Sequence, residues 1–150
     1  MKSEPLECSI HDALAAPGHT VPWVGVRNYQ ARNFMRDQMR IGDGVLFYHS
    51  SCEVPGIYGL AEVASGAYPD ATQFDPASPY FDAKSSQKEP RWLHVDVRAR
   101  SACELLSLTQ MRDNPALADL IVLQKGSRLS ITPVESKHWK VIKNLLKPLK

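Results

Sequence analysis

The chain has 150 residues, a length typical of one domain, and a formal net charge of +2. Its 43% hydrophobic and 23% charged residues exclude an intrinsically disordered chain and a strongly basic polycation. Any contact with nucleic acid would therefore depend on local patches of charge.

Cysteine usage and the absence of targeting segments indicate the compartment. Cys8, Cys52 and Cys103 are odd in number and form no Cys-x-x-Cys motif. This pattern argues against a disulfide framework and favours a reducing environment. The sequence shows no secretory signal and no apolar run of membrane-spanning length. We therefore expect a cytoplasmic single-domain protein without a membrane partner.

The first half of the chain predicts two helices and a hairpin. Residues 9–18 favour a short helix capped by Ser9. A longer helix is expected to begin near Asn28, because apolar residues at helical spacing follow it. Residues 45–50 are apolar on both alternating faces, which indicates a strand buried on two sides. Residues 57–65 are predicted to pair with it.

The second half combines a long loop with further strands and helices. Residues 65–90 hold four prolines and several aromatic residues without any period, which predicts an ordered lid that packs onto the body. Residues 91–100 alternate as a strand does, so Trp92 and His94 are expected to face away from the core. Residues 107–120 favour an interrupted helix. Residues 124–132 are expected to turn into a strand and residues 135–146 to form a closing helix. This order favours an α+β fold, a small, mostly antiparallel barrel with helices around it.

The segment from Trp23 to Arg40 carries more planar and polar side chains than a core helix needs. Asparagine and glutamine amides match the edges of a nucleobase, and aromatic rings offer faces on which a base stacks. Arg32, Arg36 and Arg40 recur every four residues, and arginines neutralise phosphates. The same pattern is typical of an amphipathic helix with a capping asparagine and a solvated arginine face. From the residues alone, both interpretations stay open.

Three other groups each have a functional and an ordinary interpretation. Tyr48 and Ser50 could rim a pocket or belong to a hairpin with one buried tyrosine. His49 and Cys52 could supply metal ligands or a catalytic dyad, but no second pair lies at metal-binding spacing. The carboxylates of the 65–90 loop could bind Mg²⁺ or act as acid and base, but Asp-Pro and Pro-Asp steps are common in turns. An enzyme using Cys52 or these carboxylates is an alternative, although no enzyme motif supports it.

Several motifs together resemble the EVE domain family. They are "MKSEP", "W-x-GVRNYQARNFMRD", "GDGVLFYHSSC", "PGIYGLAEV" and "LQKGSRLSITPV", which follow one another over residues 1–142. The resemblance implies a PUA-like fold, a mixed β pseudo-barrel flanked by helices, related to the YTH domains. It also implies a non-enzymatic module that reads a modified nucleobase, such as 5-methylcytosine or an oxidised form. Val24 stands where the family commonly has an acidic residue, and the first strand is expected to be short.

The resemblance further implies a pocket around the segment that follows Trp23. The implied ligand-binding residues are Lys2, Ser3, Glu4, Trp23, Gly25, Val26, Arg27, Asn28, Tyr29, Tyr48, Ser50, Pro55, Gly56 and Tyr80, and Arg32, Arg36 and Arg40 would contact the nucleic-acid backbone. The expected partner is DNA or RNA with a modified base, bound by a monomer without cofactor or metal. The alternatives are an RNA-associated accessory module and a protein that binds a nucleoside or another small molecule in the same cavity.

Overall fold

A computed structural model describes residues 1–149 as an α+β protein. The helices are α1 (Ile10–Ala15), α2 (Tyr29–Asp37), α3 (Leu108–Arg112) and α4 (Ser136–Leu145). The strands are β1 (Lys2–Ser3), β2 (Thr20–Pro22), β3 (Gly44–His49), β4 (Gly56–Val63), β5 (Tyr68–Pro69), β6 (Leu93–His94) and β7 (Asp96–Ser107). Short 3-10 helices are η1 (Pro17–His19), η2 (Ala71–Phe74), η3 (Pro115–Leu117) and η4 (Ile121–Leu123). No helix within residues 1–149 combines the length and the apolar character needed to cross a bilayer.

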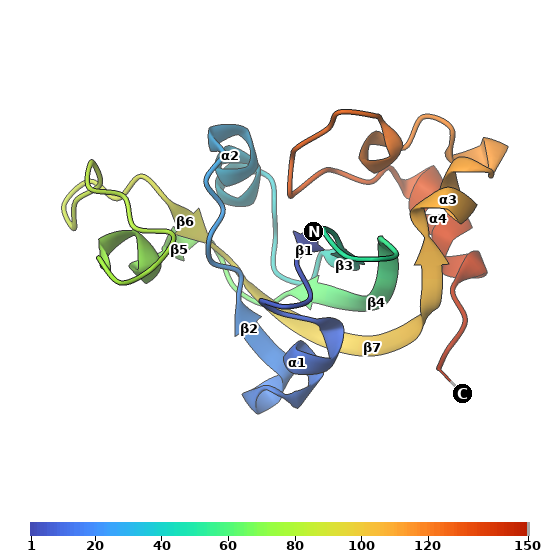
Figure 1. Cartoon of the computed structure of the whole chain (residues 1–150), viewed down its shortest axis with the longest axis horizontal. Coiled ribbons are helices and arrows are strands. Elements are labelled where there is room, and N and C mark those ends of the chain that lie inside the picture. Colours follow the sequence, from blue (N-terminus) through green and yellow to red (C-terminus); the bar gives the residue numbers. More distant parts are fainter. Residues whose placement is uncertain (150) are drawn as a thin grey trace.

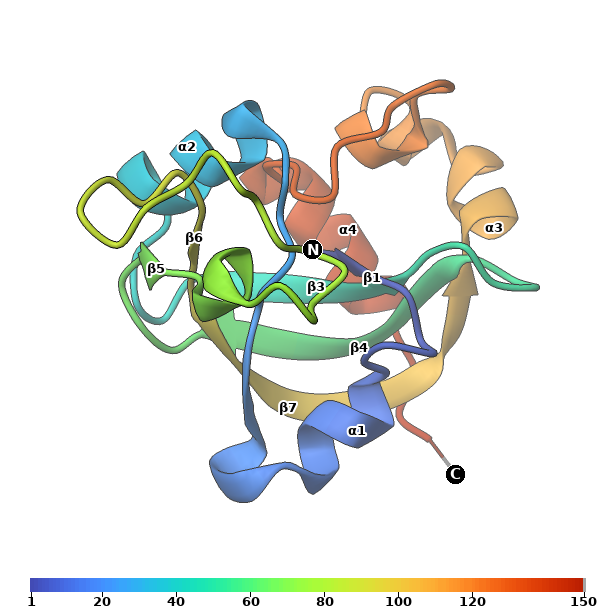
Figure 2. The same ribbon diagram turned by 60° about the vertical axis from the view of Figure 1, so that its left-hand side comes forward.

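Five strands form one curled sheet in the order β1-β3-β4-β7-β2. β1 runs parallel to β3, and the other neighbours are antiparallel. Figure 1 shows β7 curving along the sheet, with α2 and the β5–β6 ribbon near one end and α3 and α4 near the other. Figure 2 shows α1 lying beneath β7. The predicted barrel-like sheet surrounded by helices is confirmed.

Strand β3 lies between two hydrophobic cores. Val45 and Phe47 belong to a core shared with α1 and α2, whereas Leu46 and Tyr48 belong to a core shared with α3 and α4. Successive side chains of a strand point to opposite faces, so both faces are covered. This confirms the prediction of a strand buried on two sides, paired antiparallel with β4.

The helix starts follow from local capping chemistry. Ser9 begins α1 and Ser107 begins α3, each in a capping box, and Asn28 begins α2. The Asn28 side-chain oxygen accepts a hydrogen bond from the Ala31 amide at 3.0 Å. Such caps satisfy backbone amides that have no partner within the helix. All three predicted starts are confirmed.

Two predictions about strands were wrong. Residues 124–132 form a loop, and the buried Ile131 packs into the core without forming a strand. A single backbone hydrogen bond joins this stretch to β1, from the Lys2 amide to the Ser130 carbonyl at 2.8 Å. Trp92 and His94 were expected to face away from the core, but both are buried. The 65–90 loop packs back over them, and the buried Gln73 bonds to the backbone of Trp92.

Candidate functional site

A cavity of about 810 Å³ opens beside the N-terminal segment. Its walls come from residues 2–8, residues 21–26, the turn after β3, the 65–90 loop and the loop before Ile131. We call it the polar cavity. Its volume is typical of sites that hold a small molecule or a single base.

The polar cavity brings together part of the predicted site. The predicted residues that line it are Lys2, Ser3, Glu4, Trp23, Gly25, Val26, Ser50 and Tyr80. The predicted residues outside its lining are Arg27, Asn28, Tyr29, Tyr48, Pro55 and Gly56. Arg32 and Arg36 of α2, and Arg40 after its end, also lie outside it. The part that each of these residues takes in binding stays a prediction.

Trp23 forms part of the apolar wall. Its backbone amide donates to the Val95 carbonyl at 2.9 Å, and its ring meets Phe47 edge-on with centroids 5.2 Å apart. Only 7% of Trp23 is exposed, so most of the indole is packed and a small part faces the cavity beside Val26. The wall is therefore rigid, which suits stacking or edge contact with a planar ligand.

Tyr80 forms a further part of the cavity wall, over Gly25. Gly25 has φ +87, and a Cβ built there would lie 2.6 Å from the Tyr80 ring, so the ring packs directly on the glycine backbone. The Tyr80 hydroxyl donates to the Glu7 carboxylate at 2.5 Å. Burial, together with that hydrogen bond, raises the pKa of Tyr80 to about 12, so the phenol stays protonated at neutral pH.

A buried carboxylate holds these two walls together. Asp70, which has no exposed surface, accepts from the Gly25 amide at 2.8 Å and from the Arg27 guanidinium at 3.0 Å. Arg27 also donates to the Tyr80 carbonyl at 2.8 Å. Burial by itself raises the pKa of Asp70, but hydrogen bonds from Thr72, Gly25 and Arg27 outweigh it and leave that pKa below the ordinary value. Asp70 thus fixes the glycine loop against the 65–90 loop.

Next to Asp70 and Arg27, arginine and aromatic side chains stack on one another. The Arg27 guanidinium lies 5.5 Å from the Tyr80 ring and 5.4 Å from the Trp92 ring. Tyr29 stacks on Trp92 at 4.7 Å, and Arg32 covers Tyr29 at 4.6 Å. Each contact is a cation–π or stacking interaction that stiffens the segment between β2 and α2.

The predicted stripe of three arginines on one helix is only partly formed, because α2 ends at Asp37 and Arg40 lies in the turn after it. Arg36 and Arg40 are both held by nearby residues. Arg36 pairs with Asp37 at 2.7 Å, and both side chains are exposed. Arg40 donates to the carbonyls of Asp37 and Met39. Because exposed pairs of this kind contribute little to stability, these guanidinium groups can exchange their partners for phosphates at small cost.

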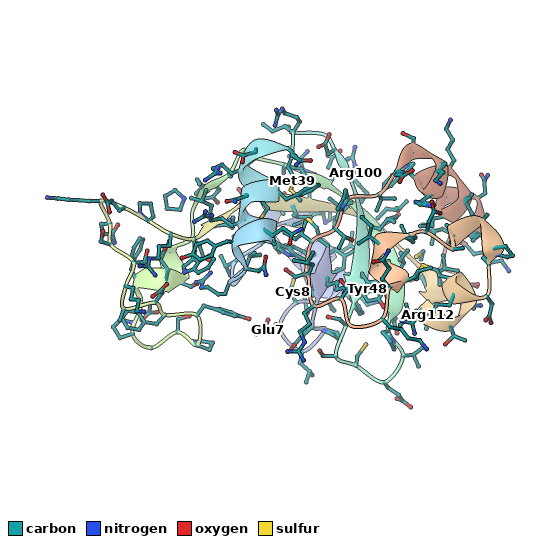
Figure 3. All side chains as sticks on the ribbon, turned by 90° about the horizontal axis from the view of Figure 1, so that it is seen from above. Glu7, Cys8, Met39, Tyr48, Arg100 and Arg112 are labelled. Carbon is teal, nitrogen blue, oxygen red and sulfur yellow. The ribbon has the colours of Figure 1, made fainter. Side chains whose placement is uncertain are left out.

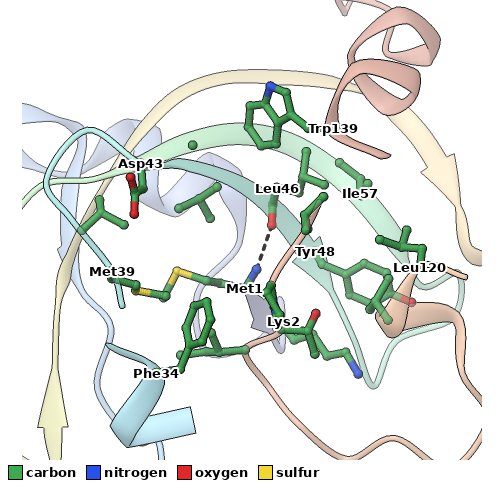
Figure 4. Close-up of a pocket in the computed structure, with 18 of the residues that line it drawn as sticks. Met1, Lys2, Phe34, Met39, Asp43, Leu46, Tyr48, Ile57, Leu120 and Trp139 are labelled. Atoms are coloured by element: carbon green, nitrogen blue, oxygen red, sulfur yellow. Dashed lines mark hydrogen bonds between the residues drawn. The ribbon is translucent and has the colours of Figure 1, made fainter. Parts of the chain in front are cut away.

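Tyr48 faces a different cavity, of about 490 Å³, which we call the apolar cavity. Figure 4 shows Phe34, Met39, Ile57 and Trp139 around it. The Met1 ammonium donates to the Leu46 carbonyl at 3.0 Å, and burial lowers its pKa to about 5. The walls are mainly aliphatic and aromatic, with few polar groups aimed inward. A base edge needs several such groups, so we favour the polar cavity as the candidate site.

The His49–Cys52 pair has an ordinary structural role. The His49 Nε2 atom accepts from the Ile10 amide at 3.1 Å, and its ring stacks on Tyr58 at 4.2 Å. The Nε2 atom is therefore already bonded and not free to bind a metal or to act on a thiol. Within residues 1–149, no three His, Cys, Asp or Glu side chains gather as metal ligands would.

Several lining residues escaped sequence reasoning. They are Glu7, Cys8, Val21, Pro22, Val24, Ser51, Ser127, Arg128 and Ser130. The stretch around Arg128 was predicted to turn into a strand, so no sequence signal marked it as part of a cavity wall. In Figure 3, Glu7 and Cys8 lie to one side of Tyr48 and Arg112 to the other, so the N-terminal segment approaches from one side.

The chain is similar to known proteins over nearly its whole length. The sequence model of the EVE domain family matches residues 1–145. Human thymocyte nuclear protein 1 is 36% identical in an alignment that covers 97% of this chain and 72% of the human protein. The chicken protein of that name is also 36% identical, and this chain spans 66% of its length.

Solved structures agree with this relationship. A crystal structure from Pseudomonas putida has a TM-score of 0.91 and 46% identity, and covers 97% of this chain and 96% of that one. Human THYN1 in complex with 5-methylcytosine containing DNA has a TM-score of 0.90 and 37% identity, and covers 97% and 94%. These similarities confirm the predicted PUA-like α+β fold. The chain therefore belongs to the EVE domain family.

Proposed function

We propose that this protein binds nucleic acid and takes a single modified base, such as 5-methylcytosine or an oxidised form, into the polar cavity without catalysing a reaction. The observation that carries the proposal is a cavity lined by the rings of Trp23 and Tyr80 together with charged side chains, which are Lys2, Glu4, Glu7 and Arg128. A relative of the same fold was crystallised with 5-methylcytosine containing DNA. That relationship supports the same class of ligand here.

The energetics of such a site follow from base extrusion. Taking a base out of its stack costs a few kcal/mol, which contacts in the pocket must replace. A stacking or edge contact with an aromatic ring contributes about 1–3 kcal/mol per base. A methyl group buried against Val26 and the Trp23 indole adds about 0.8 kcal/mol. The proposed contacts to the nucleic-acid backbone are Arg32, Arg36 and Arg40, together with Arg128, which lines the cavity.

Titration of matched oligonucleotides tests this proposal. Fluorescence anisotropy with single-stranded and duplex probes that differ only in one cytosine or 5-methylcytosine should show about fourfold tighter binding of the methylated probe, the value of one buried methyl group. Equal affinity for every probe would contradict a modified-base reader. Binding of free 5-methylcytidine as tightly as the oligonucleotide would favour the nucleoside-binding alternative.

A further inference from the structure

The turn between β1 and α1 presents a leucine to solvent beside the polar cavity. Glu4, Glu7 and Cys8 of this turn line the cavity, whereas Leu6 does not. Leu6 is fully exposed, and no other large apolar residue within residues 1–149 is exposed to the same extent. Single exposed apolar residues are common, so exposure alone indicates nothing. What distinguishes Leu6 is its position among residues that line a cavity with room for one base.

The turn that carries this leucine is closed by backbone hydrogen bonds and tied to β1. The Glu4 carbonyl accepts from the Glu7 amide at 2.9 Å and from the Cys8 amide at 3.0 Å. Pro5 stands at the second position of this turn, where its fixed φ favours the turn conformation. The Ser3 hydroxyl donates to the Cys8 carbonyl at 2.6 Å, which joins the turn to the strand. The exposed side chain therefore projects from a rigid support.

The turn is also fixed relative to the cavity wall, and its charge is negative. The Glu7 carboxylate accepts from the Tyr80 hydroxyl at 2.5 Å, and the Tyr80 ring packs on Gly25. Carboxylates repel phosphates, so Glu4 and Glu7 disfavour a phosphate backbone at this turn, whereas amino groups on base edges can donate to them. A duplex that approaches the cavity would therefore meet Leu6 with its base pairs.

Extrusion of a base from a duplex leaves a gap that an apolar side chain can fill. The two neighbours of the extruded base lose their stacking on it, which is a large part of the cost of extrusion. Apolar side chains inserted between base steps act as wedges in proteins that unstack and kink DNA. A leucine that lies in water loses no packing within the protein when it inserts, and it gains the burial of its side chain. The rigid turn reduces the entropy lost on binding.

We propose that Leu6 is a wedge, which inserts into the stack of a DNA duplex at the place that the bound base has left. The proposal rests on the proposed function, because the polar cavity must take the extruded base. It goes beyond that function by naming duplex DNA as the partner and by assigning a residue outside the cavity. Leu6 is then a positioning residue, which contacts the neighbouring base pairs and not the extruded base.

Leu6→Ala tests the wedge with a duplex and a single strand of the same sequence, each carrying one 5-methylcytosine. The change removes three carbon atoms, so affinity for the duplex should fall about 10- to 50-fold. Affinity for the single strand should stay within about twofold of the wild type, because no complementary strand holds a gap open there. Leu6→Met keeps an apolar side chain of similar volume and should keep the duplex affinity within about threefold.

Leu149→Ala is the matched control for this experiment. Leu149 is 52% exposed and lines neither the polar nor the apolar cavity, and Figure 1 shows the C-terminus well apart from the N-terminus. This variant should bind both probes as the wild type does, and thermal unfolding checks that every variant is folded.

The possible outcomes separate the wedge from the proposed function. Wild-type duplex affinity in Leu6→Ala, or an equal loss for duplex and single strand, would overturn the wedge. If the wild type binds methylated and unmethylated duplexes equally while Leu6→Ala loses affinity for duplexes alone, the wedge is supported and only the preference for a modified base is contradicted.

Discussion

Replacing Asp70 with alanine should lower the free energy of unfolding by about 3–5 kcal/mol, the usual cost of removing one partner of a buried ion pair. The variant leaves the Arg27 guanidinium, which is 21% exposed, without its carboxylate, and leaves the Gly25 amide without an acceptor. Thr72 also loses the Asp70 oxygen to which both its amide and its hydroxyl donate hydrogen bonds. Urea denaturation measures the loss.

The exposed Arg36–Asp37 pair provides a matched control for Asp70. Asp37→Ala removes a carboxylate that also pairs with an arginine, but on the surface. It should change the free energy of unfolding by less than about 1 kcal/mol. Because the pKa of Asp70 is lowered by folding, its contribution is present at pH values above the ordinary 3.8 and is lost as the pH falls through the folded value. Asp70→Asn should therefore flatten the acid limb of the stability curve. Equal losses in Asp70→Ala and Asp37→Ala would contradict the anchor.

Gly25→Ala should lower the affinity for a probe with the modified base at least about tenfold. The new Cβ would lie 2.6–2.9 Å from three carbons of the Tyr80 ring, so the ring must leave its place and break its contact with Glu7. The backbone at φ +87 adds strain of about 1–3 kcal/mol. Anisotropy titration with the 5-methylcytosine probe, together with urea denaturation, separates the loss of binding from the loss of stability.

Gly42→Ala isolates the contribution of backbone strain. Gly42 has a similar φ of +94, but a Cβ there would meet nothing within 4 Å. This variant should lose only the stability that backbone strain costs, about 1–3 kcal/mol, while its affinity for the probe stays within twofold of the wild type. If both variants bind equally well, the contact between Gly25 and Tyr80 does not shape the site.

Local signals predicted most of the fold. The Asn28 and Ser107 caps and the doubly buried strand around Phe47 depend on residues close in sequence, and each prediction was confirmed. The predicted strand around Ile131 was wrong, because its apolar side chain packs into the core although the stretch pairs with no strand. Burial of Trp92 depends on a loop that folds over it, which alternation within one strand cannot reveal.

The residues alone raised Trp23 and Ser50 as candidates, and only the family resemblance favoured a binding pocket over an ordinary helix and hairpin; the role of these residues in binding stays a prediction. Composition alone left the Trp23–Arg40 segment open between a binding surface and an ordinary helix. The contacts that define the polar cavity join residues far apart in the chain, such as Gly25 with Asp70 and Glu7 with Tyr80. In the sequence, Asp70 looks like an ordinary turn aspartate, because its partners at positions 25 and 27 lie far from it along the chain.

Intermolecular NOE spectroscopy tests the central claim most directly. An oligonucleotide whose single 5-methylcytosine carries a ¹³C-labelled methyl group is added to the 16.7 kDa protein. A base lodged in the polar cavity should give NOEs from that methyl group to the Trp23 indole and the Val26 methyl groups. NOEs only to side chains of α2, or to Trp139 in the apolar cavity, would contradict the account.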